Sequence, residues 1–190
     1  NVEAQQRALQ AGIDVLNYEF TIQLPETGRH IDAHALITVR RSSALDNIAF
    51  DLAGLQVDTV WVNAKPSAFQ KDNATLRVFL GPGSRLTADT LLVDIHYCGE
   101  VKDGLIIQTD NKGRWSAFGD NWPTRARFWL PTVDDPADKA SVTWNVIAPI
   151  DRKVVALTGQ LRPHAAHGPD QLLLRLQQAG PVLDLHPQLG

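Results

Sequence analysis

Apolar and polar residues alternate along several short stretches of the chain, and this alternation constrains the fold more than any other feature. In residues 13–24, Tyr18 and Phe20 fall on one side of an extended chain, while Glu19 falls on the other. A period of two residues is typical of a β-strand that buries one face. Residues 31–39 repeat the pattern, so we expect a second half-buried strand there.

Further short apolar runs follow at near-regular spacing. They cover residues 48–52, 57–62, 74–80, 90–97, 140–148, 154–157 and 171–176. No long stretch with a helical period separates them, although residues 2–11 are expected to form a short helix within an N-terminal helix or tail (1–12). We therefore predict a mostly β fold, an antiparallel or mixed β-sandwich or saddle, in one domain over residues 1–190.

Composition excludes several classes of function. The formal net charge is -3 and no basic run occurs, so nucleic acid is not an expected partner. No window of about 18 apolar residues is present, so no membrane span is expected. Cys98 is the single cysteine, which rules out an internal disulfide. The chain begins with Asn1 and contains no Met, which a removed signal peptide or a trimmed chain would each explain.

Residues 116–140, here called the signature segment, concentrate aromatic, charged and proline residues. Pro123, Pro131 and Pro136 each remove a backbone donor and restrict the residue before them, so no helix is expected. The segment is predicted to be a long ordered connection whose aromatic residues anchor it and whose charges need partners. Such connections in compact domains often carry function or form interfaces.

The signature segment also carries a family resemblance. Asp120-Asn-Trp-Pro-Thr-Arg-Ala-Arg-Phe-Trp-Leu-Pro, followed by Val133-Asp-Asp-Pro, resembles the N-terminal domain of the M1 (gluzincin) zinc aminopeptidases, and most closely bacterial members that read Asp-Asn-Trp-Pro. Asp14-Val-Leu-Asn-Tyr, the run 57–63 and Ile95-His-Tyr-Cys-Gly with Gly104-Leu resemble other family passages in the same order. Residues 159–169 depart from the pattern.

The resemblance implies a fold and a role. The family's zinc motif, His-Glu-x-x-His, does not occur in these residues. The chain is therefore expected to stop at a domain boundary, to hold no metal or cofactor and to be inactive alone. The catalytic domain of the same polypeptide would be its partner and would hold zinc and the peptide substrate. A periplasmic or secreted location is suggested.

The resemblance also assigns candidate site residues. In the family, a Gln or Glu five residues ahead of the Arg at position 127 helps hold the substrate's free α-amine, but Trp122 stands there and the first polar residue of the pattern falls on Asp120. Either Asp120 or Asn121 substitutes, or the catalytic domain binds the amine alone. Trp122 could instead line the first side-chain pocket. The expected structural signature consists of Arg127, Trp129, Asp134 and Asp135.

Other residues that could carry chemistry have simpler interpretations. His164 and His167 lie three apart, but Pro163 prevents the helix that would place them on one zinc-binding face, so a solvated loop is expected. His34 is expected to be exposed on a strand. His96 is expected to be a hydrogen-bonded sheet residue.

Asp134 and Asp135 could act as an acid and base pair, but are expected to cap a turn and pair with Arg125 or Arg127.

A free-standing β-sandwich that binds a sugar or a partner protein is the alternative function. An enzyme with an unrecognised site has little motif support.

Overall fold

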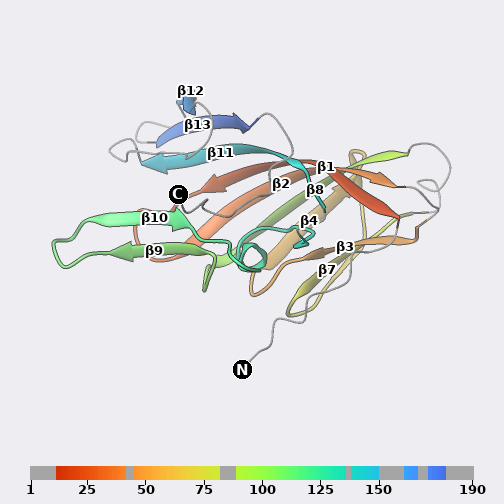
Figure 1. The fold of residues 1–190 in the computed structure, drawn as a ribbon, viewed down its shortest axis with the longest axis horizontal. Helices are drawn as coiled ribbons and strands as arrows, with labels where there is room; N and C mark the ends of the chain where they lie inside the picture. Colours follow the sequence, from red (N-terminus) through yellow and green to blue (C-terminus); the bar gives the residue numbers. More distant parts are fainter. Residues whose placement is uncertain are drawn as a thin grey trace.

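Within the residues that the computed structural model describes, the regular secondary structure is almost entirely β-strand, arranged in three sheets (Figure 1). These residues are 12–41, 45–81, 89–135, 138–149, 161–166 and 171–178. The expected helix at residues 2–11 and the expected strand at 154–157 lie outside these ranges. The predicted fold class, a mostly β domain with antiparallel and mixed sheets, is confirmed.

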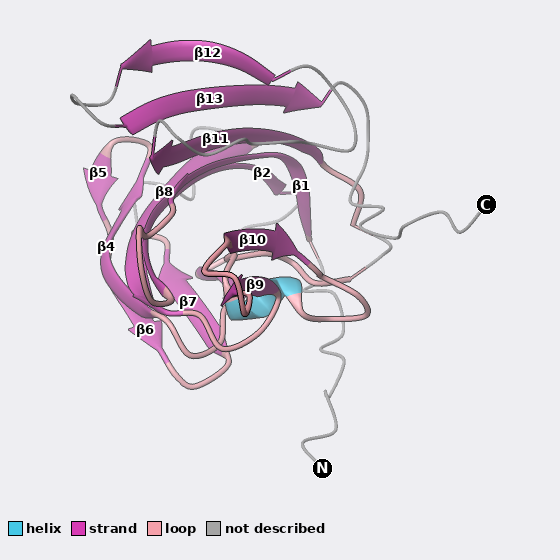
Figure 2. Cartoon of the chain, turned by 90° about the vertical axis from the view of Figure 1, so that its left-hand side faces the viewer, coloured by secondary structure: helices cyan, strands magenta, loops and turns pink. Residues whose placement is uncertain are grey.

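The largest sheet has eight strands. In spatial order they are β12 (Leu161–Ala166), β13 (Gln171–Gln178), β11 (Ser141–Pro149), β1 (Ile13–Gln23), β2 (His30–Arg41), β8 (Thr90–Glu100), β4 (Gln56–Val62) and β5 (Lys65–Pro66). Neighbouring strands are antiparallel except for β1 and β11, which run parallel with Phe20 beside Trp144. The sheet curves into an arc (Figure 2).

Two small sheets complete the described fold. One contains β3 (Asn47–Asp51), β7 (Thr75–Phe79) and β6 (Phe69–Lys71), and the other is a hairpin of β9 (Leu105–Thr109) and β10 (Trp115–Gly119). The hairpin and a short 3-10 helix (Ala126–Phe128) lie inside the arc of the large sheet (Figure 2). We call the face of the large sheet that looks into the arc the inner face, and the opposite face the outer face.

The hydrophobic core lies against the inner face, as the alternation predicts. Tyr18, Phe20 and Ile22 of β1 are buried there, and Ala35 and Ile95 stand beside Phe20 on the next two strands. Burying an aromatic or large aliphatic side chain contributes about 1.5–3 kcal/mol. The inner face therefore provides a firm surface on which the signature segment can pack.

The structure corrects two predictions. The signature segment is not wholly an irregular connection, because β10 occupies its first residues and the 3-10 helix lies between its prolines. A single turn of this kind fits between Pro123 and Pro131, where a longer helix would not. Residues 161–166, which include His164, form strand β12 rather than a solvated loop, whereas His167 lies outside the described residues. Within the described residues, β12 is the last strand at one end of the large sheet, and an edge strand tolerates a proline such as Pro163.

Candidate functional site

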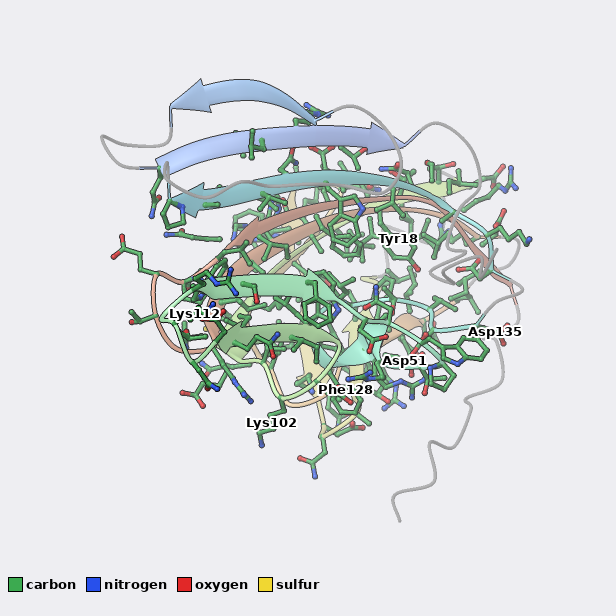
Figure 3. All side chains as sticks on the ribbon, turned by 60° about the vertical axis from the view of Figure 1, so that its left-hand side comes forward. Tyr18, Asp51, Lys102, Lys112, Phe128 and Asp135 are labelled. Carbon is green, nitrogen blue, oxygen red and sulfur yellow. The ribbon has the colours of Figure 1, made fainter. Side chains whose placement is uncertain are left out.

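The signature segment is tied to two separate parts of the fold by its backbone. Asp51 and Thr132 form an antiparallel bridge, with the Asp51 amide donating to the Thr132 carbonyl at 2.7 Å and the Thr132 amide donating back at 3.1 Å. The Val133 amide donates to the Tyr18 hydroxyl at 2.9 Å. Tyr18, Asp51 and the helix residue Phe128 lie on the inner side of the large sheet (Figure 3). These bonds fix the position of the segment.

A buried tryptophan provides the main side-chain anchor. Trp129 stacks on Trp144 with ring centroids 5.6 Å apart, and Trp144 in turn contacts Phe20. Its indole Nε1 donates to Asn121 Oδ1 at 2.7 Å. Trp129 is thus buried in the core, and the buried Asn121 is its hydrogen-bond partner.

A close backbone approach joins the segment to the start of β9. Gly104 has a φ of +77°, and a Cβ at this position would lie 2.1 Å from the Arg125 carbonyl oxygen and 2.7 Å from Trp129 Cδ1. The Asp120 amide donates to the Gly104 carbonyl at 2.6 Å. Only glycine fits here, because any other side chain would meet both strain and overlap.

Three charged side chains meet beside this contact. Arg125 Nε donates to Asp103 Oδ1 at 2.7 Å, and its Nη1 donates to Asp120 Oδ2 at 2.5 Å. The hydrogen bond from Arg125 holds the pKa of Asp103 below its usual value. Two carboxylates share one guanidinium, so the half-exposed group has an excess of one negative charge.

A second ion pair is more deeply buried. Arg127 Nε donates to Asp134 Oδ2 at 2.9 Å, so Arg127 is the partner among the two expected arginines. Burial raises the pKa of Asp134 despite this bond, with Asp51 and Asp135 adding like charge. Breaking such a pair on one side would leave an uncompensated buried charge. The pair of Arg127 and Asp134 is therefore a structural contact that links the 3-10 helix to the residues that follow Pro131.

Asp138 fixes the beginning of β1. Its Oδ1 accepts a hydrogen bond from the Val15 amide at 3.2 Å. Burial, helped by the negative charges of Asp14 and Asp135, raises the pKa of Asp138 to about 6 despite the opposing effect of the Val15 bond. Its charge therefore opposes folding at neutral pH.

The three candidate substrate-binding residues differ in their surroundings. Asn121 is buried against Trp129, whereas the Asp120 side chain is 45% exposed and Trp122 is 53% exposed. Phe118, four residues before Trp122, is 49% exposed. The segment is thus held from inside and presents aromatic and acidic groups outside.

The sequence did not single out Asp103, Asp51 or Tyr18 as contacts of the segment. Gly104 lies in one of the passages that resemble the family, and this resemblance was the indication in the sequence that Gly104 could have a specific role.

The family's catalytic zinc does not fit the residues present. Its His-Glu-x-x-His motif is missing from the sequence, and the helix described between residues 12 and 178 has three residues. Within the described ranges, no helix is long and apolar enough to cross a membrane.

Comparison with solved structures shows the same fold in an M1 zinc metallopeptidase and in a yeast hydrolase. A point variant of the M1 zinc metallopeptidase from Deinococcus radiodurans is 25% identical with a TM-score of 0.77, over 91% of this chain and 40% of that one. Yeast LTA4 hydrolase is 17% identical with a TM-score of 0.75, over 90% of this chain and 27% of that one. The chain thus spans about two fifths of the Deinococcus protein.

Sequence comparison gives a direct family match. No curated protein matches the sequence significantly. The profile of the peptidase M1 N-terminal domain, however, matches residues 15–170, which is most of the chain. The matched range begins in β1 and includes the whole signature segment, the part of the sequence that carried the resemblance. This chain therefore belongs to the peptidase M1 N-terminal domain family.

Proposed function

We propose that this chain is the non-catalytic N-terminal domain of a zinc aminopeptidase, which packs on the catalytic domain and walls the cleft that binds peptide N-termini. The observation that carries the proposal is the signature segment, which is anchored by buried contacts while Trp122 and Phe118 remain exposed. Large exposed aromatic side chains on a fixed backbone are typical of surfaces that meet a partner. Zinc and the catalytic base belong to the catalytic domain in this proposal.

The charge of the segment supports a role in binding the substrate amine. Asp103 and Asp120 share Arg125, so the three side chains together carry one net negative charge. Asp120 is two residues before Trp122 in the sequence. An ammonium group carries one positive charge and three donors, so a half-exposed carboxylate suits it. We propose Asp120 as the group that contacts the amine, Asn121 as its buried support and Trp122 as an apolar contact for the first substrate side chain.

Variants of the full-length enzyme test this role. Asp120→Asn removes one charge-assisted contact, worth about 1.5–3 kcal/mol, so kcat/KM for aminoacyl substrates should fall by roughly 10–100-fold. Asp58→Asn, at an exposed position of β4, is the matched control and should leave kcat/KM unchanged. Trp122→Ala should raise KM, whereas Trp61→Ala on the outer face should not. Equal effects of the Asp120 and Asp58 variants would refute the assignment.

The chain alone provides a second test. Mixed with zinc and an aminoacyl chromogenic substrate, the purified 190-residue chain should show no turnover, because it lacks the family's His-Glu-x-x-His motif and the Glu within it. Turnover that survives chelation and further purification would overturn the proposal. The coding sequence beyond Gly190 should encode His-Glu-x-x-His and a downstream Glu. A stop codon at that point would instead favour a free-standing binding module.

A further inference from the structure

The outer face of the large sheet carries a row of metal-ligating side chains that the proposed function does not use. In the pairing of β2 and β8, His34 stands directly opposite His96, and Asp32 stands opposite Cys98. Asp94 precedes His96 by two residues and therefore points to the same face. Directly opposite residues on one face bring their side chains into contact. The pairing thus gathers His34, His96 and Asp94 from two strands.

The three side chains converge on one point. His34 Nε2 lies 2.9 Å from Asp94 Oδ1, and His96 Nε2 lies 3.4 Å from the same oxygen. The two imidazole rings stack with centroids 4.5 Å apart. All three ligand atoms lie within 4.8 Å of one another. Ligands bound tetrahedrally at about 2.0–2.2 Å from an ion are separated by roughly 3.3–3.6 Å. Small side-chain rotations would therefore bring the three ligand atoms to the separations that one ion requires.

We propose that His34, His96 and Asp94 bind one divalent first-row transition-metal ion, with Zn²⁺ as the representative. Two imidazoles and one carboxylate suit zinc, copper and nickel, whereas calcium and magnesium prefer oxygen ligands alone. The side chains are 32%, 53% and 33% exposed, which leaves the remaining coordination position to water. The site lies on the face of the sheet opposite the signature segment and does not depend on the proposed function.

A neighbouring cluster on the same strands provides a contrast. His30, Asp32 and Cys98 also come together, but His30 Nε2 is 3.8 Å from Asp32 Oδ1 and both side chains are more than half exposed. This cluster is therefore the weaker one and serves as an internal control.

Metal titration of the purified 190-residue chain tests the assignment. Isothermal titration with Zn²⁺ should show one equivalent bound. Because loss of even an outer-shell partner costs about 10–100-fold in affinity, His34→Ala or His96→Ala should weaken binding by at least roughly tenfold. His30→Ala and Cys98→Ser should retain the wild-type affinity. Circular dichroism in the absence of metal should show that all four variants are folded.

An NMR measurement separates ligation from simple hydrogen bonding. A hydrogen bond to Asp94 requires a proton on imidazole Nε2, whereas a metal requires its lone pair. Zinc should therefore shift the Nε2 resonances of His34 and His96, and leave that of His30 in place. The proposal is overturned if the wild-type chain binds no zinc, if the His34 and His96 variants bind it as well as the wild type, or if the His30 or Cys98 variant alone abolishes binding.

Discussion

Replacing Gly104 by alanine should destabilise the domain more than a change at any open glycine. The backbone at Gly104 has a φ of +77°, and this left-handed conformation costs alanine roughly 1–2 kcal/mol. The new Cβ would also lie 2.1 Å from the Arg125 carbonyl oxygen, an overlap with backbone that requires the segment to move. Overpacking of this kind typically adds about 1–3 kcal/mol. Gly104→Ala should therefore lower the melting temperature by about 10 °C.

Gly28→Ala is the matched control for this prediction. Gly28 has a φ of +76°, but a Cβ there would have nothing within 4 Å. The control therefore measures the cost of the backbone conformation alone, and should lower the melting temperature by only about 4 °C. Thermal unfolding followed by circular dichroism provides both values. If the two variants melted at the same temperature, the inferred contact between Gly104 and the signature segment would be refuted.

Three further changes probe buried polar contacts. Asp138→Asn should stabilise the domain by up to about 3 kcal/mol at pH 7.5, because the folded pKa of about 6 exceeds the unfolded value. The gain should fall as the pH drops below about 6 and vanish only below about pH 3, where both states are protonated; a constant gain across this range in denaturant titrations would contradict the pKa assignment. Tyr18→Phe leaves the Val133 amide without its acceptor and should cost about 1–3 kcal/mol in urea unfolding. Asn121→Ala should cost a similar amount through Trp129 Nε1, whereas an unchanged midpoint would show that water replaces the amide.

The strands with strong alternation could be read from the sequence, but those with weak patterns could not. The alternation in residues 13–24 predicted the position of β1 to within one residue, because a strand that buries one face has an apolar residue at every second position. The hairpin of β9 and β10 was missed, because β10 alternates with small and polar residues and its exposed Phe118 breaks the pattern. The short strands β5 and β6 are too brief to show any period.

The contacts of the candidate site follow a similar division. The pair of Arg127 and Asp134 is separated by seven residues, so proximity in the sequence suggested it. The bond between Tyr18 and Val133 spans 115 residues, and that between His34 and Asp94 spans 60. Both depend on which strands pair and in which register, and a single sequence does not specify register when several strands share the same alternation.

The parallel pairing of β1 with β11 has a consequence for synthesis of the chain. Asn17 is paired with Ser141, 124 residues later. The second edge of β1 is therefore covered only after most of the domain has been synthesised. On the ribosome, a nascent chain that has completed β2 but not β11 would present an open strand edge to other chains. Premature termination between these strands should therefore yield a product that aggregates rather than a smaller soluble domain.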